Sequence, residues 1–453
     1  MTRGDVIQAA FKAWGRTRYR STSLSQVAGE LGVSKAALYR HFANKQALLE
    51  AMYEWFLDDY SAAVKDGFQR AAAAGPGEAV CILVRVIMGY YARNVHVFMF
   101  SLVYVYGERR LGNSRELLAK RGVSLEAFGA VQNIAPFPQA LHLVLATLIF
   151  AVAYFHRLGP AEKTPVETVP SPNGGIFTEM GIERDISLVL CIVSQGLGFH
   201  KKTDVLDYDA LEGKVSGINR NIEENELLHC VAEAVAGAGP WDVSMEMVAR
   251  VSGLSKSGLY AHFTNKRDML VQLFVTEFDR IIDFAEASME FSAVPAERLY
   301  LAIFAICDYL RSRPDVLIAM DWLRTRRLGG SSEFGEKRIP PRLYRVFRNI
   351  PCSPELTRRL SGLEDDWIPS WLLFLIVTAL MQGVRTDAKR FMEWLDMPEG
   401  RRRKLFREEL VRVPNESFRN LYRFIVVGIG NSGLPPGSGE AVYGNCEKDM
   451  VQP

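Results

Sequence analysis

A 27-residue stretch that occurs twice constrains this chain more than any other feature of its sequence. Residues 23–49 read SLSQVAGELGVSKAALYRHFANKQALL, and residues 244–270 read SMEMVARVSGLSKSGLYAHFTNKRDML. The two segments align without a gap at a shift of 221 positions, and 13 of their 27 residues are identical. Similarity of this extent indicates a tandem duplication, so the same fold must be built twice.

Each copy has the pattern of two short helices separated by a glycine turn, followed by the start of a third helix. In the first copy, Ser23 and Gln26 form a capping-box pair, and Gly32 suits the left-handed residue that ends a helix. Ser34 can cap the second helix and Asn44 the third. A short helix, a turn and a second short helix with basic and aromatic residues outside make a helix-turn-helix.

The shared pattern VA-x-x-x-G-[VL]-SK-x-x-LY-x-HF-x-NK-x-x-L resembles the DNA-binding segment of the TetR family of bacterial transcriptional regulators. The resemblance covers roughly the first 55 residues of each half. It implies an all-α fold of two tandem units. Each unit would consist of a three-helix DNA-binding head, which carries the helix-turn-helix, and a helical-bundle regulatory body.

The chain of 453 residues is long enough for two such units joined by a connector. We place the boundaries at residues 1–47 (first head), 48–200 (first body), 201–221 (connector), 222–268 (second head), 269–430 (second body) and 431–453 (disordered tail). The Pro- and Gly-rich stretch 159–181 is expected to be a flexible insertion. The echoes RRLGNS at 109–114 and RRLGGS at 326–331, and a weaker match of Tyr91 with Tyr309, indicate that the duplication extends into the bodies.

Apolar periodicity predicts the main helices of both units. They are expected at 5–14, 44–70, 79–106, 141–157 and 183–198, and again at 223–235, 265–291, 296–311, 315–326, 367–384 and 415–427. The segment AGAGPWD at 236–242 is expected to connect the first two helices of the second head. The apolar stretches 141–155 and 368–384 are expected to be buried core helices, because the first is too short to span a membrane and the second contains Pro369 and Gln382.

The first head carries the residue types that DNA binding requires. Phosphate neutralisation supplies most of the affinity, and groups that reach base edges supply sequence discrimination. The candidate DNA-binding residues are Ser34, Lys35, Ala36, Ala37, Tyr39, Arg40, His41 and Lys45, together with Arg18 and Arg20 in the basic connector that precedes the helix-turn-helix. The helix that begins at Lys35 has the length to enter a major groove. The alternative is a helical bundle that merely carries surface charges.

The roles of these residues follow from position and from the resemblance. Lys35, Ala36, Ala37 and Arg40 lie where side chains could reach bases. The resemblance assigns Tyr39 and His41 to the phosphate backbone. Lys45 lies at a helix N-terminus, where its ammonium group and the unpaired backbone N–H groups could hold one phosphate together.

The second head has the same pattern with a different charge. Its candidate DNA-binding residues are Ser255, Lys256, Ser257, Gly258, Tyr260, His262 and Lys266. Residues 1–50 contain eight Lys or Arg against three acids, a net charge of +5, whereas residues 222–271 contain four against seven, a net charge of −3. Because DNA is a polyanion, the two heads are expected to bind it unequally. The second head could also be a retained but weak reader.

Composition excludes several other classes. The six cysteines are far apart and form no C-x-x-C pair, so neither a zinc site nor a disulfide framework is expected, and no cofactor is implied. The segment MTRGDVIQAA has no apolar core typical of a secretory signal. We therefore expect a cytoplasmic, nucleoid-associated protein. No Ser-His-Asp or Cys-His spacing, paired acids or phosphate loop supports catalysis, so we do not expect an enzyme.

The resemblance implies a ligand-responsive transcriptional repressor that binds a double-stranded DNA operator and a small-molecule effector. Two units in one chain favour an intramolecular pseudo-dimer joined through the last two helices of each body. A dimer of whole chains with four heads is the competing assembly. Two other classes stay open: an architectural DNA-binding protein without an effector, and an enzyme that turns over a small molecule in the bodies.

Overall fold

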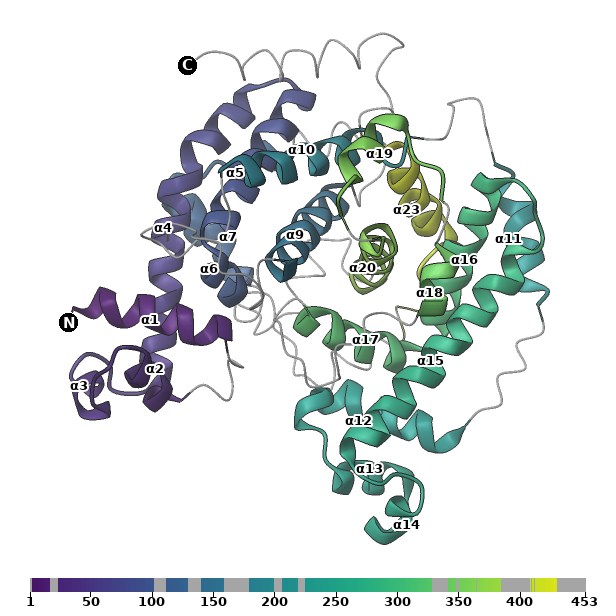
Figure 1. The fold of residues 1–453 in the computed structure, drawn as a ribbon, viewed down its shortest axis with the longest axis horizontal. Coiled ribbons are helices and arrows are strands. Elements are labelled where there is room, and N and C mark those ends of the chain that lie inside the picture. Colours follow the sequence, from purple (N-terminus) through teal and green to yellow (C-terminus); the bar gives the residue numbers. More distant parts are fainter. Residues whose placement is uncertain are drawn as a thin grey trace.

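A computed structural model describes the protein over residues 2–16, 23–101, 111–128, 140–158, 179–198, 206–218, 225–327, 341–347, 350–363, 365–383, 408, 410 and 412–429. The described residues form α-helices and contain no β-strand, which confirms the predicted all-α class. The same succession of helices occurs twice, so the chain is built from two tandem helical units (Figure 1).

The helices of the first unit are α1 (Arg3–Arg16), α2 (Leu24–Glu30), α3 (Lys35–Tyr39), α4 (Lys45–Ala73), α5 (Pro76–Arg93), α6 (Val95–Phe100), α7 (Leu111–Lys120), α9 (Ala140–Leu158) and α10 (Glu179–Gln195). The helix α11 (Tyr208–Ser216) follows. The second unit comprises α12 (Glu226–Asp242), α13 (Met245–Ser252), α14 (Lys256–Tyr260), α15 (Lys266–Met289), α16 (Pro295–Ser312), α17 (Pro314–Arg327), α18 (Pro341–Val346), α19 (Pro354–Leu360), α20 (Trp367–Gly383) and α23 (Asn415–Val427).

The two heads project from the same side of the molecule, below the bodies in the view of Figure 1. In each unit one long helix, α4 or α15, starts at the head and continues into the body, where it packs on α5 or α16. The first helix of each head also packs on the body, α1 against α6 and α12 against α17. Each head is therefore connected to its body at two points.

The predicted helix 79–106 is wrong in its length, because the chain breaks at Asn94 between α5 and α6. The second unit breaks at the equivalent place, at Arg313 between α16 and α17. Both residues have φ near −125°, outside the helical range (−124° and −127°). The break turns the following helix toward the head, where α6 meets α1 and α17 meets α12.

A buried tyrosine links the long helix to its neighbour in both units. The Tyr90 hydroxyl donates to Asp59 on α4 (2.9 Å), and the Tyr309 hydroxyl donates to Glu277 on α15 (2.8 Å). Tyr90 therefore corresponds to Tyr309. The match of Tyr91 with Tyr309 made from the sequence is wrong by one residue. Desolvation is the main cause that raises the pKa of both phenols.

Two segments predicted to be irregular are helical. The segment 236–242 forms the last part of α12, so the connector predicted there is wrong. The connector 201–221 contains α11, which packs on α16. Its Asp207 caps the helix by accepting from the N–H of Ala210, and Leu211 and Val215 are buried on one face. These are ordinary helix signals in a segment whose overall composition is polar.

The helix α11 is fixed to the second body by a buried carboxylate. Glu212 is 6% exposed and accepts hydrogen bonds from Asn415 (2.7 Å) and Arg419 (2.7 Å), and also from the Tyr300 hydroxyl. The ring of Tyr208 lies 4.7 Å from that of Tyr300. A buried charge is tolerated only when it is paired and hydrogen-bonded, and Glu212 meets both conditions.

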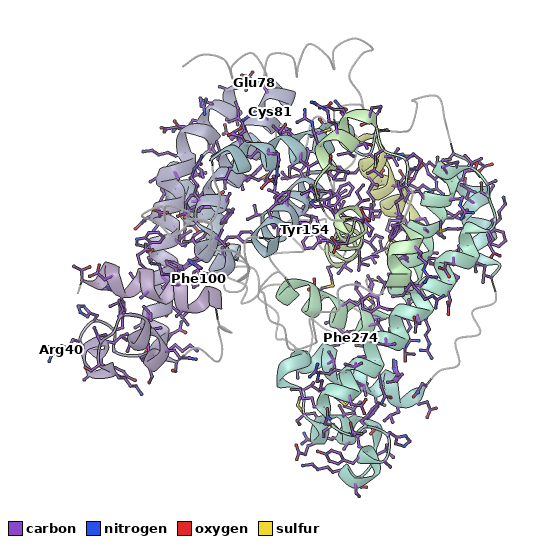
Figure 2. All side chains as sticks on the ribbon, viewed as in Figure 1. Arg40, Glu78, Cys81, Phe100, Tyr154 and Phe274 are labelled. Carbon is purple, nitrogen blue, oxygen red and sulfur yellow. The ribbon has the colours of Figure 1, made fainter. Side chains whose placement is uncertain are left out.

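The two units meet through α9 and α10 of the first and α20 and α23 of the second, which we call the joint. At its centre the Trp371 indole N–H donates to the Thr147 hydroxyl (3.1 Å), and both side chains are buried. The Tyr154 hydroxyl donates to Asp366, and Figure 2 shows Tyr154 between the two units. The ring of Phe150 packs edge-on against Trp367 at 5.2 Å. Each of these three contacts joins unlike residues.

The C-terminal ends of α10 and α23 form a reciprocal pair of backbone hydrogen bonds. The N–H of Leu197 donates to the carbonyl of Ile425 (2.8 Å), and the N–H of Ile429 donates to the carbonyl of Val193 (2.9 Å). Residues 193 and 425 are separated by the same 232 positions as residues 197 and 429. This end of the joint therefore has the pattern of a two-fold contact made within one chain.

Glycines permit this close approach. Gly196 and Gly428 both have left-handed backbone angles (φ 60° and 62°). A Cβ at Gly196 would lie 2.5 Å from the carbonyl oxygen of Ile425, and one at Gly428 would lie 2.6 Å from that of Val193. Only glycine combines the positive φ with room for the opposite backbone.

Several predicted features lie outside the described residues. They include residues 159–178 of the expected insertion, while its last residues, 179–181, belong to α10. The predicted tail 431–453 also lies outside them. Within the part of the chain that the structure describes, no helix is both long and apolar enough to cross a membrane.

We predict that Gly428→Ala lowers the free energy of unfolding by roughly 2–4 kcal/mol, because it adds backbone strain and a steric overlap at the joint. Denaturant unfolding of the full chain measures this loss. Gly122 is the matched control, since it has φ 85° but no atom within 4 Å of the position that a Cβ would take; Gly122→Ala should cost only about 1 kcal/mol. Equal losses would contradict the steric role of the joint glycine.

Candidate nucleic-acid interface

Local capping positions the helix-turn-helix in both heads as the sequence predicts. In the first head the Ser23 hydroxyl and the Gln26 side chain form a complete capping box at the start of α2. Gly32 ends that helix with φ 64°, and its counterpart Gly253 has φ 69°. Because each cap uses a side chain a few residues from the bond it makes, the same short pattern yields the same geometry twice.

The helices α3 and α14 are fixed from beneath by one apolar residue each. Leu38 and Leu259 are completely buried, and the aromatic rings of Phe42 and Phe263 that follow are nearly so (2% exposed each). The residues on the opposite face of each short helix are consequently directed outward. This arrangement leaves one face of a short helix open, as entry into a major groove would require, while the other face packs within the head.

The structure leaves most candidate residues of the first head exposed. Lys35, Ala36, Tyr39 and Arg40 are exposed, and Figure 2 shows Arg40 at the outer edge of the head. The Lys35 ammonium lies 5.8 Å from the centre of the Tyr39 ring. A cation beside an exposed phenol is a suitable pair for a DNA backbone.

Three other candidates of the first head are less open, whereas Ser34 is exposed. Ala37, His41 and Lys45 are half-buried. The Ser34 hydroxyl accepts from the N–H of Ala37 (3.2 Å), so it acts as a helix cap as well as a candidate contact. Arg18 and Arg20 lie outside the described residues.

The second head presents the equivalent surface. Lys256, Ser257, Tyr260 and His262 are exposed, whereas Gly258 and Lys266 are half-buried. The Ser255 hydroxyl caps α14 by accepting from the N–H of Gly258 (3.0 Å) and lies 3.0 Å from that of Ser257. The first head has an alanine at the position of Gly258 under the same cap, so local packing does not require a glycine there.

Two acidic residues distinguish the second head, and the sequence shows them only as part of its net charge. The Lys256 ammonium donates to Glu246 on α13, and this contact lowers the pKa of Glu246 and raises that of Lys256. Asp268, in the first turn of α15, accepts from the backbone N–H of Thr264 (2.8 Å) and its pKa is lowered by that bond. The first head has Ser25 and Ala47 at the two equivalent positions.

The described residues of the bodies form no cluster of three His, Cys, Asp or Glu side chains that could bind a metal ion. Of the described cysteines, Cys81, Cys191 and Cys307 are buried, as expected for small hydrophobes, whereas Cys230 and Cys352 are half-buried. Burial is the main cause that raises the pKa of Cys191 and Cys307. Cys446 lies outside the described residues.

The fold and the exposed basic helices define a protein with two helix-turn-helix domains. Comparison of the sequence with protein families gives a match to the family "Bacterial regulatory proteins, tetR family" at residues 6–52 and again at 231–273. The chain thus carries the N-terminal domain of this family twice, as the repeated sequence pattern predicts.

Two curated proteins of Bacillus subtilis (strain 168) are similar to parts of the chain. The uncharacterized HTH-type transcriptional regulator YuxN is 38% identical over 53 residues, which are 12% of this chain and 18% of the relative. The uncharacterized HTH-type transcriptional regulator YhgD is 22% identical over 149 residues, which are 29% of this chain and 74% of the relative. The first similarity thus spans less than a fifth of that relative, and the second spans about three quarters.

We predict that Lys45→Ala weakens binding to all DNA sequences by a similar factor. The residue lies at the N-terminus of α4, where a phosphate is favoured by the helix dipole and the first N–H groups. The dependence of log K on log salt concentration should become shallower by about one, which titrations at several salt concentrations measure. A changed base preference with an unaltered salt dependence would assign Lys45 to base reading instead.

Proposed function

We propose that the protein is a sequence-specific DNA-binding transcriptional regulator, a ligand-responsive repressor whose two heads act as an intramolecular pseudo-dimer. The observation that carries this proposal is the presence of two family-matched heads on one side of a single chain, each with its reading helix exposed. The similarity to two HTH-type transcriptional regulators supports it.

The joint supports the pseudo-dimer over a dimer of whole chains. A symmetric dimer pairs one surface with its own copy. Here α9 and α10 of the first unit are already covered by α20 and α23 of the second. The contact of Thr147 with Trp371 lies at the centre of this packing, and the paired backbone hydrogen bonds lie at the ends of α10 and α23. A second chain would have to displace this packing in order to use the same helices.

The connections between joint and head suggest how an effector could act. In the second unit α17 packs on α12 of the head and also on α20 of the joint. A shift of α17 would therefore change the position of the head relative to the joint. An effector changes DNA binding only if it binds one arrangement better than the other.

The first body offers an aromatic cluster near its own head as a site for an apolar effector. The rings of Tyr60, Tyr90, Tyr91 and Phe98 lie within 5.0–5.7 Å of their neighbours. They belong to α4, α5 and α6, of which α4 and α6 contact the first helix of the head. A small apolar molecule inserted among these rings would move the helices to which the head is attached.

Selection of bound DNA from a random pool by the full chain tests the regulator proposal. A regulator enriches one defined sequence, and its binding to that sequence exceeds its binding to unrelated DNA by a factor of about 10³ or more. Enrichment of no sequence, with tight binding to all DNA, would favour an architectural protein. No binding to any DNA at low salt would exclude both.

We predict that one chain binds one operator. Light scattering of the complex should give the mass of a single chain plus DNA, because both heads belong to one molecule. Footprinting should show two protected half-sites whose centres are one helical turn, ~10 bp, or a multiple of it apart. A stable two-chain particle on a strict palindrome would contradict the pseudo-dimer.

We also predict that the heads contribute unequally. Tyr39→Ala should remove most operator binding, whereas the equivalent change Tyr260→Ala should cost appreciably less, because the head around Tyr260 has a net negative charge over residues 222–271. The two tyrosines are exposed to a similar extent (45% and 47%), so the two substitutions remove comparable surface from their heads. Measuring both variants on one operator at fixed salt compares them; an equal or larger loss from Tyr260→Ala would contradict the charge argument.

A further inference from the structure

We infer that Glu246 and Asp268 limit DNA binding by the second head, because each occupies a group that a DNA phosphate would otherwise engage. This inference rests on the proposed function and names the residues responsible for the unequal heads. It differs from a general charge effect, since it assigns the weakness to two positions and not to the seven acids of residues 222–271.

The first contact engages Lys256, the cation of α14, with a carboxylate of the same head. Lys256 is the first residue of α14, and its ammonium donates to Glu246 in the first turn of the preceding helix. Both side chains are more than half exposed, so the ion pair lies at the surface that faces DNA. A phosphate that approaches Lys256 must either displace this carboxylate or bind beside a second negative charge.

The second contact places the carboxylate of Asp268 at the N-terminus of α15. One carboxylate oxygen of Asp268 accepts from both the backbone N–H of Thr264 (2.8 Å) and its hydroxyl (3.1 Å), and the other accepts from Gln272 (3.1 Å). Helix N-termini attract anions through their first N–H groups and through the helix dipole. Thr264 directly precedes the cap residue Asn265, so its N–H lies at this end of α15. In the second head the protein's own carboxylate already fills that role, next to the candidate phosphate contact Lys266.

The first head is a natural control for both contacts. Ser25 lies at the position of Glu246, and Ala47 lies at the position of Asp268; neither carries a charge. Lys35, the counterpart of Lys256, lies over the Tyr39 ring. The caps made by Ser34 and Asn44 match those made by Ser255 and Asn265, so the two heads differ in these carboxylates while their helices start at equivalent residues.

The experiment removes the carboxylates in the full chain with the first head weakened by Tyr39→Ala. The probe is a fluorescent duplex of random sequence, about three helical turns long, and anisotropy titrations at several salt concentrations give the affinity. In this background Glu246→Gln should raise the affinity about threefold, and Glu246→Gln with Asp268→Ala on the order of tenfold. Each freed contact should make the salt dependence steeper by about one.

Two matched variants separate the local effect from net charge. Glu226→Gln removes the same charge from the exposed start of α12, on a helix that carries none of the candidate DNA-binding residues, and should leave the affinity nearly unchanged. Ser25→Glu installs the second head's residue in an otherwise unaltered first head and should weaken binding about threefold. Unchanged thermal unfolding midpoints check that each variant is folded.

The outcomes distinguish this inference from the proposed function. If Tyr39→Ala weakens binding while Glu246→Gln behaves like Glu226→Gln, the inference is wrong and the regulator proposal stands. If neither Tyr39→Ala nor Ser25→Glu changes binding and no DNA sequence is selected, the proposed function itself is wrong. A gain from Glu246→Gln alone, with none from Asp268→Ala, would overturn the part of the inference that concerns Asp268.

Discussion

The packing of α9 and α10 against α20 and α23 is the constraint on which the rest of the structure depends. It fixes the two bodies, and through them the long helices α4 and α15 fix the heads. The joint combines large buried side chains, among them Trp367 and Trp371, with a backbone contact that only glycine allows. Burial of each such aromatic contributes roughly 1.5–3 kcal/mol, while the glycine contact sets the geometry in which that burial occurs.

The features that the sequence predicts well are those in which cause and effect are neighbours in the chain. Ser34 and Asn44 cap helices that begin at the next residue, and Gly32 takes the left-handed angle that ends the helix before it. The duplication makes these signals stronger because each is seen twice. The helix-turn-helix and the all-α class could therefore be predicted from residues alone.

The features that the sequence does not reveal depend on contacts between distant segments. Glu212 belongs to a stretch that looks like a polar connector, yet Tyr300, Asn415 and Arg419 make it a buried anchor. Gly428 looks like the beginning of a glycine-rich tail, but its conformation is required by the backbone of α10. The pair of Glu246 with Lys256 is similarly hidden, because the two residues lie ten positions apart on different helices.

A joint closed within one chain has a consequence for how the protein responds to its own concentration. A regulator assembled from two separate chains loses its paired heads on dilution, so its occupancy of DNA falls with a power of concentration above one. Here the partner unit is always present at the effective concentration set by the chain itself. Under the proposed function, occupancy of the operator should then rise as a simple hyperbola with protein concentration, even at the lowest abundance. A single molecule in a cell would already carry both DNA-binding heads.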